Sequence, residues 1–253
     1  MDMINTASEK DNRPVIDIQG LYKSFGKNEI LKGVDITVKK GENLVVLGKS
    51  GSGKSVTIKC LVGLVDADEG EIKVFDTDIT KLDNAELNAI RIRIGFLFQN
   101  SALYDSMSVR QNLEFPLKRH SKNLGHKEVD AAVTDALESV GLAEAIDKMP
   151  SELSGGMRKR IGLARTLILN PEIILYDEPT TGLDTITSRE ISELILALQK
   201  KYKTTSIIIT HDMACAKLTS DRVIILKEGV IGAEGTYEEL EKSEDEWVRS
   251  FFI

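Results

Sequence analysis

Hydrophobic and polar residues follow two patterns along the chain. Short apolar runs, continuous or alternating, are typical of strands, and apolar positions three or four residues apart are typical of helices. The pattern predicts strands at residues 15–21, 34–38, 44–47, 71–75, 94–98, 173–176, 206–210 and 223–226. It predicts helices at about 53–62, 83–93, 127–140, 188–202 and 213–218, with a further helix capped by Ser154.

The order of these elements indicates the fold class. Strands that alternate with helices predict an α/β protein with a largely parallel sheet covered on both faces. Residues 100–169 interrupt this order, because their pattern is mostly helical. We therefore predict an α/β core from residues 14–99 and 170–253, with a helical subdomain at 100–169. The polar residues 1–13 are predicted to be a flexible lead-in.

Composition and charge narrow the classes of function. Lys plus Arg is 33 and Asp plus Glu is 40, so the formal charge is 33 − 40 = −7, which argues against nonspecific binding to nucleic acid. No signal peptide is predicted, and no apolar run approaches the roughly 20 residues that span a bilayer. Cys60 and Cys215 are too few for a disulfide framework and are predicted to be buried thiols.

The strongest chemical motif lies at residues 48–55, Gly-Lys-Ser-Gly-Ser-Gly-Lys-Ser. It fits the P-loop pattern, and it lies between a predicted strand and a predicted helix, as that pattern requires. Glycines allow backbone N–H groups to surround phosphate oxygens at the start of a helix. Lys54 can then reach the terminal phosphates, and Ser55 can place its hydroxyl on Mg²⁺. The alternative is an ordinary glycine-rich turn before a helix.

Two carboxylates follow the apolar strand at 173–176. Asp177 can hold Mg²⁺ through its water shell, and Glu178 can orient or deprotonate an attacking water. Such a pair alone often marks only a solvated strand end, but a P-loop upstream favours a catalytic role. The two motifs together predict a nucleotide hydrolase or a phosphotransferase.

Residues 153–157, Leu-Ser-Gly-Gly-Met, begin a predicted helix that continues through Arg165. They resemble the signature motif of the ATP-binding cassette (ABC) ATPases. The resemblance implies the ABC ATPase fold, with a P-loop core, an N-terminal antiparallel β part and an inserted helical subdomain. It also implies hydrolysis of ATP with Mg²⁺, in a homodimer whose two ATP molecules each lie between one P-loop and the other chain's signature.

The resemblance assigns roles to single residues. Phe25 matches the aromatic residue that stacks on adenine, with Tyr22 as a rival in the same segment. Gln99 matches a glutamine that contacts Mg²⁺ and water, and His211 matches a histidine that contacts the γ-phosphate. Asp184 matches an aspartate that reaches the partner, although Thr185 replaces the proline of many cassettes. Altogether, the resemblance implies that the following residues contact the nucleotide: Phe25, Gly48, Lys49, Ser50, Gly51, Ser52, Gly53, Lys54, Ser55, Val56, Ser154, Gly155, Gly156 and Asp184.

The other histidines and cysteines suggest no further chemistry. His120 and His126 match no family motif and are predicted at the surface. The three histidines and two cysteines are too scattered in sequence for a cluster of metal ligands.

A softer resemblance concerns the subgroup. Met157 stands where most transport cassettes have glutamine. This residue resembles the ATPases of Mla-type transporters, and so do two segments, 100–117 and the aromatic 247–252. This mammalian-cell-entry (MCE) group moves phospholipids between bacterial membranes. Some members extend into a tail that clasps the neighbouring subunit, which is in doubt here because the sequence stops at Ile253.

The subgroup implies partners and a location. The partners are a membrane permease, an MCE-domain lipid-binding protein and a small regulatory protein of the STAS type, with no nucleic acid. The ATPase would lie peripherally on the cytoplasmic face of the inner membrane. Residues 99–109 would receive a short permease helix, since Leu103, Tyr104, Met107 and Val109 would be costly to expose together.

Two other readings of the sequence remain open. One is the ATPase of an importer for amino acids or other small solutes. The other is a cassette that works without a membrane partner, such as a chromosome-maintenance head or a translation factor. A chromosome-maintenance head needs a long coiled coil, and a translation factor of this kind carries two cassettes in one chain. The sequence shows neither feature.

Overall fold

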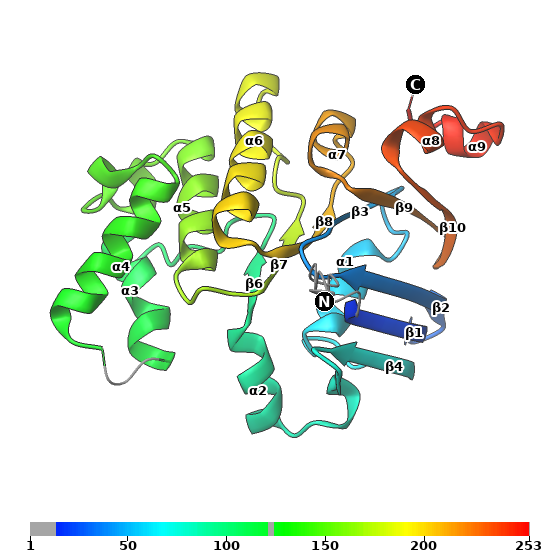
Figure 1. Ribbon diagram of the computed structural model, residues 1–253, viewed down its shortest axis with the longest axis horizontal. Helices are drawn as coiled ribbons and strands as arrows, with labels where there is room; N and C mark the ends of the chain where they lie inside the picture. Colours follow the sequence, from blue (N-terminus) through cyan, green and yellow to red (C-terminus); the bar gives the residue numbers. More distant parts are fainter. Residues whose placement is uncertain (1–13, 121–123, 253) are drawn as a thin grey trace, which may run out of the picture.

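The computed structural model describes residues 14–120 and 124–252, so the predicted flexible lead-in lies outside the described residues. A six-stranded sheet runs through the molecule in the order β10-β9-β3-β8-β7-β6 (Figure 1). Its members are β3 (Asn43–Gly48), β6 (Ile94–Leu97), β7 (Ile173–Asp177), β8 (Thr205–Ile209), β9 (Arg222–Lys227) and β10 (Val230–Gly235). Every pair is parallel except β9 with β10. The predicted α/β class is therefore confirmed.

A second sheet is antiparallel and forms from the first part of the chain. It has the order β2-β1-β4-β5, with β1 (Pro14–Phe25), β2 (Asn28–Lys39), β4 (Glu69–Val74) and β5 (Thr77–Asp78). The first two strands each have 12 residues, longer than predicted, because a tight hairpin pairs their polar ends as well.

Nine helices lie between or after the strands in the described part of the chain. They are α1 (Lys54–Leu61), α2 (Asn84–Ile92), α3 (Val109–His120), α4 (His126–Ser139), α5 (Gly155–Leu167), α6 (Thr185–Tyr202), α7 (Met213–Thr219), α8 (Tyr237–Glu241) and α9 (Glu246–Arg249), with short 3₁₀ turns at Ile79–Lys81, Ala143–Ala145 and Pro150–Glu152. Aspartates cap several of these helices. Asp83 forms a capping box with Glu86 at the start of α2, and Asp184 and Asp212 cap α6 and α7.

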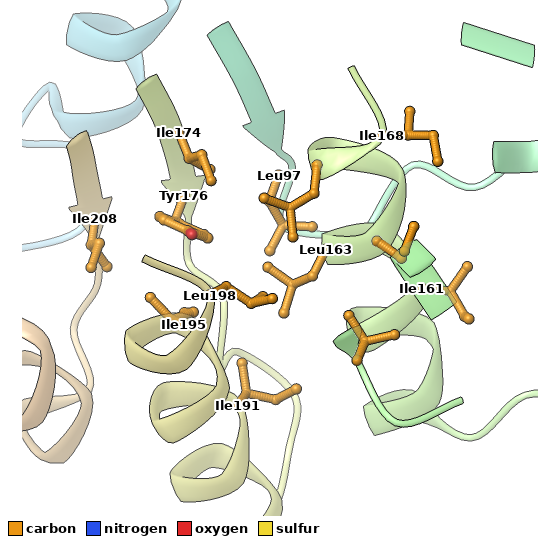
Figure 2. Close-up of a cluster of buried hydrophobic side chains, with 14 of the residues drawn as sticks. Leu97, Ile161, Leu163, Ile168, Ile174, Tyr176, Ile191, Ile195, Leu198 and Ile208 are labelled. Carbon is orange, nitrogen blue, oxygen red and sulfur yellow. The ribbon is translucent and has the colours of Figure 1, made fainter. Parts of the chain in front are cut away.

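Two hydrophobic clusters lie on opposite faces of the larger sheet. Successive side chains of a strand point to opposite faces, so Ile174 and Tyr176 of β7 enter one cluster and Ile173 and Leu175 enter the other. The first cluster includes α5 and α6, as Figure 2 shows. The second includes β1, β2 and α1. This arrangement fixes the carboxyl ends of β3, β7 and β8 between two packed layers.

Helices α3, α4 and α5 lie together between β6 and β7 in the chain (Figure 1). The predicted apolar face of 127–140 is confirmed, since Val133 and Leu137 of α4 are fully buried. These helices share one hydrophobic cluster with α6 and the sheet. The division at residues 99 and 169 stays a prediction.

Within residues 14–120 and 124–252, no helix combines the length and the apolar character needed to cross a bilayer.

Candidate functional site

A cavity of about 860 Å³ opens where β3 and β7 end. The P-loop forms one wall. The other lining residues come from β1, β2, the segments that follow β6, β7 and β8, and the segment that follows α9. The lining residues are Phe25, Ile30, Gly48, Lys49, Ser50, Gly51, Gly53, Lys54, Ser55, Val56, Gln99, Glu178, His211, Ser250 and Phe251. Residues far apart in the sequence therefore meet at one edge of the sheet, as expected for ligand sites in α/β folds.

The backbone of the P-loop requires glycine at three positions. Gly48, Gly51 and Gly53 have φ values of +156°, +79° and +107°, which side chains disfavour. A Cβ atom on Gly53 would also lie 2.6 Å from Leu31 Cδ2. Gly53 is the N-cap of α1 and offers no side chain to its amides. The first N–H groups of α1 are thus available to an anion.

Lys54 lies at the start of α1 and is 9% exposed. Its Nζ donates hydrogen bonds to the carbonyl oxygens of Gly48, at 2.8 Å, and Lys49, at 3.2 Å. Burial lowers the pKa of Lys54, and the nearby carboxylates of Glu178 and Asp177 oppose that change. The ammonium is therefore held inside the loop that would surround phosphates.

Ser55 and Asp177 form the part of the site suited to a metal. The Ser55 hydroxyl donates to Asp177 Oδ1 at 2.9 Å, and Asp177 is 7% exposed. Magnesium prefers hard oxygen ligands and keeps several waters, so a hydroxyl beside a carboxylate fits this ion. Gln99, the third predicted ligand, lines the same cavity.

Glu178 and His211 are in direct contact. His211 Nδ1 lies 2.7 Å from Glu178 Oε2, and the Thr181 hydroxyl donates to the same oxygen at 3.1 Å. Glu178 has φ +53°, which is unusual for a residue with a side chain. Strain of this kind gathers at functional sites, and here it directs the carboxylate of Glu178 into the cavity.

The two candidate aromatic residues of β1 have different surroundings. Phe25 is 50% exposed and lines the cavity. Tyr22 instead lies over Gly33 of β2, where its hydroxyl is 2.8 Å from the position of an added Cβ. The geometry therefore favours Phe25 over Tyr22 as the platform for a base.

The signature residues lie outside this cavity. Ser154 is the N-cap of α5, and its Oγ accepts a hydrogen bond from the Met157 N–H at 3.2 Å. Gly156 lies against α6, because a Cβ there would be 2.7 Å from Thr187 Cγ2. Asp184 is exposed and accepts hydrogen bonds from the Ile186 and Thr187 N–H groups and the Thr187 hydroxyl. These bonds, the Thr187 hydroxyl first, lower the pKa of Asp184.

Several other predictions can be compared with the structure. Ser52 is 7% exposed and is not among the residues that line the cavity. His120 and His126 are exposed, and Cys60 and Cys215 are buried, as predicted. The expectation that Val109 contributes to a partner surface is wrong. This residue begins α3 and is fully buried, because it belongs to the hydrophobic cluster that α3 shares with α4, α5 and the sheet.

Sequence reasoning missed three lining residues: Ile30, Ser250 and Phe251. Ile30 lies on β2, opposite the P-loop. Ser250 and Phe251 follow α9, and Phe251 packs edge-on to Trp247 with ring centroids 5.2 Å apart. The aromatic segment 247–252 carried a signal, but nothing in the sequence connected it to the P-loop.

Comparison with known proteins gives consistent results. A protein-family model described as "ABC transporter" matches residues 31–181, more than half of the chain. "Probable ribonucleotide transport ATP-binding protein mkl" of Mycobacterium tuberculosis is 41% identical over 236 residues. That match covers 93% of this chain and 66% of the relative. The match thus spans just under two thirds of the length of that relative.

Two other relatives have different names. An Arabidopsis thaliana protein, "Protein TRIGALACTOSYLDIACYLGLYCEROL 3, chloroplastic", is 39% identical, with 96% of this chain and 74% of that protein covered. "Methionine import ATP-binding protein MetN" of Campylobacter jejuni is 36% identical, with 89% and 72% covered.

Among solved structures, a dimeric ATP-binding cassette in a post-hydrolysis state with ADP and Pi is similar to this chain. It has a TM-score of 0.80 and 31% identity, and the match covers 88% of this chain and 98% of that one.

Proposed function

The chain belongs to the ABC transporter family and carries its ATP-hydrolysing cassette domain, and from this premise we propose that it powers phospholipid transport through a separate permease. The observation that carries the catalytic part is the contact between Glu178 and His211, 2.7 Å apart, in the same cavity as the P-loop. The lipid part rests on sequence likeness, and the permease partner rests on one exposed surface.

In the proposed site, the P-loop amides and Lys54 hold the phosphates of ATP, and Phe25 offers a ring face to adenine. Val56, in the first turn of α1, lines the same wall. Mg²⁺, when bound to Ser55, Gln99 and the water shell of Asp177, would neutralise developing charge on the phosphates. The chain's own contribution is to hold these groups at fixed positions before reaction.

Glu178 is placed to orient or deprotonate the attacking water. Its Oε2 is held by the Thr181 hydroxyl and by the imidazole of His211, so the side chain has little freedom to turn away. His211 is largely exposed toward the cavity, with 68% of its side chain accessible. It can therefore contact a terminal phosphate while its Nδ1 stays on the carboxylate.

We propose that a second copy of the chain completes the site. Ser154, Gly155 and Gly156 begin α5, which offers helix-dipole charge and free amides to an anion. They are not among the residues that line their own chain's cavity. A partner's γ-phosphate is the natural ligand, and Asp184, beside them at the start of α6, would lie in the same interface. The dimeric relative with ADP and Pi supports this arrangement.

An exposed aromatic pair supports a permease partner. Tyr104 is 45% exposed and Phe115 is 38% exposed, and their rings meet edge to face with centroids 5.2 Å apart. The Arg165 guanidinium lies 5.6 Å from the Tyr104 centroid. We propose that a cytoplasmic helix of the permease covers this pair. Tyr104 follows Gln99 by only five residues, which connects docking to the site.

The choice of lipid over other cargo has specific support. Met157 and residues 100–117 resemble the MCE-type ATPases, and the Arabidopsis relative, named for a galactolipid, aligns with 96% of this chain. The names of other relatives favour rival cargoes, a ribonucleotide or methionine. In our proposal the remaining partners are an MCE-domain lipid-binding protein and a STAS-domain protein. The chain would then lie on the cytoplasmic face of the inner membrane.

The deciding experiment is purification of the tagged chain with its native membrane partners in detergent. We expect an integral permease and an MCE-domain protein in the complex. In nanodiscs, adding phospholipid should raise ATP hydrolysis, while methionine or ribonucleoside monophosphates should not. Stimulation by either small solute, with no response to phospholipid, would replace lipid transport with the importer alternative. Full turnover without any membrane partner would favour the cassette that works alone.

A further inference from the structure

A buried ammonium lies behind the site, outside every role described above. Lys159 of α5 is 4% exposed. Its Nζ donates to two backbone carbonyl oxygens, that of Gln99 at 2.5 Å and that of Glu178 at 3.1 Å. One side chain therefore connects α5 to both strand ends that carry the proposed water-orienting residues. Lysine is rarely buried without a specific partner, so this arrangement calls for a function.

The contact with Glu178 fixes an unfavourable backbone conformation. The Glu178 N–H donates to the Ile209 carbonyl at 2.9 Å. The Glu178 carbonyl accepts from Lys159 Nζ at 3.1 Å and from the Thr181 N–H at 3.3 Å. The first bond orients the peptide plane before Glu178, and the bonds to the carbonyl orient the plane after it. Together they hold φ at +53°, which a side chain ordinarily disfavours. The direction of the carboxylate depends on this conformation.

The contact with Gln99 is one of several between α5 and the segment 97–102, which includes the end of β6. Gly162 lets α5 approach closely, because a Cβ there would lie 2.9 Å from Leu97 Cδ1 and 3.0 Å from Ser101 Cβ. Arg165 donates to the carbonyls of Ala102, at 2.6 Å, and Ser101, at 3.2 Å. Among the described residues of α5, only Lys159 donates hydrogen bonds both to this segment and to Glu178.

We propose that Lys159 is a positioning residue that sets the backbone of Glu178 and Gln99 from the signature helix. This inference rests on the proposed roles of Glu178 and Gln99. Lys159 lies five residues after Ser154, about 7.5 Å along the helix axis. A shift of the start of α5 toward a partner's phosphate would therefore move the carbonyls that Lys159 holds. The chain's own water-orienting groups would respond to the ATP bound by its partner.

The test compares Lys159→Met with Arg160→Met in the full-length chain. Methionine keeps the length and apolar stem of lysine without its donors. Arg160 is the next residue on α5, and it contacts Glu190 and the Val140 carbonyl instead of either strand end. For Lys159→Met we expect kcat to fall about 10- to 100-fold. The KM for ATP should stay within about 2-fold, because Lys159 does not line the cavity. Arg160→Met should leave kcat within about 2-fold of the wild-type value.

A double-mutant cycle separates positioning from general destabilisation. In a Glu178→Gln chain the carboxylate is already absent, so adding Lys159→Met should lower the residual rate by less than about 2-fold. Lys159→Arg, which keeps donors, should recover part of the lost kcat. If Lys159→Met does not fold, Lys159→Gln, which retains an amide donor and is shorter, takes its place with the same expected loss.

Three results would overturn the inference: kcat within 2-fold of wild type, KM rising as much as kcat falls, or a further full loss in the Glu178→Gln background. A failure of the proposed function looks different. In that case Glu178→Gln itself would hydrolyse ATP at the normal rate, whatever happens at Lys159.

Discussion

Glu178→Gln separates hydrolysis from binding and folding. Glutamine has nearly the same shape and can still accept a hydrogen bond from Thr181, but it cannot take a proton from water. A positioned base contributes about 10²- to 10⁴-fold to a rate, so we expect kcat to fall about 10³-fold. That loss corresponds to roughly 4 kcal/mol of transition-state stabilisation.

The structural cost of the same change is much smaller. Glu178 Oε2 takes part in two contacts, with the Thr181 hydroxyl and with His211 Nδ1, and Gln can keep one of them unchanged. One altered hydrogen bond is worth about 1 kcal/mol, which shifts Tm by about 2–4 °C in a chain of this size. Nucleotide affinity should not weaken, because one negative charge leaves a cavity that receives an anion.

The assay measures phosphate release at saturating ATP and Mg²⁺, nucleotide affinity with a fluorescent ATP analogue, and the dimer fraction by size exclusion. The variant should accumulate as an ATP-bound dimer. Glu190→Gln is the matched control, because it makes the same charge change at a half-exposed carboxylate paired with Arg160. Retention of more than about a tenth of wild-type kcat would remove Glu178 from its catalytic role.

The remaining predictions concern other parts of the site and the core. Lys54→Ala should lower ATP affinity at least about 10-fold, since it removes a charged contact with phosphate; unchanged binding in a fluorescence titration would contradict the P-loop assignment. Mixing inactive Lys54→Ala and Ser154→Arg chains should restore turnover to at most about a quarter of wild type, because half of the dimers are mixed and each has one intact site beside an empty one; full wild-type turnover in every mixture would argue against shared sites. Phe25→Ala should raise the Kd for ATP about 5- to 100-fold through lost stacking, whereas Phe25→Tyr should bind normally by the same titration. Burial raises the pKa of both Cys60 and Cys215 to about 11, so at pH 8 only about one thiol in a thousand is ionised; both should react with a disulfide reagent only after unfolding, and rapid reaction of the native protein would contradict their burial.

Much of the fold could be predicted because its central strands are buried on both faces. Strand β3 is buried at all six positions and β7 and β8 at all five, so each gives a continuous apolar run in the sequence. Strand β10 was missed because it forms an edge, where exposed and half-buried residues alternate. Helices α8 and α9 have five and four residues, too short for a helical period to be recognised.

The residues of the candidate site also differ in how far the sequence could predict them. The P-loop, Asp177 and Glu178 were predictable, because phosphate chemistry requires those residue types at fixed spacings. Lys159 was not, because it lies in a run of basic residues that is typical of a solvated helix face. Its burial depends on the ends of β6 and β7 converging on α5, a contact across 60 residues to Gln99 and 19 to Glu178. No local pattern records such a contact.

In the proposed dimer, helix α5 would connect the cavity of one chain to the ATP bound by the other. Its first residues, capped by Ser154, do not line their own chain's cavity, whereas Lys159 in its second turn bonds the backbone behind that cavity. A rigid helix transmits a displacement of one end to the other with little loss. A phosphate bound at the start of α5 would therefore favour one position of Glu178, and release of that phosphate would allow the strained backbone to relax. Each site of the dimer would then turn over faster while its twin is loaded. This coupling would suit a transporter that must use its ATP in step with its permease.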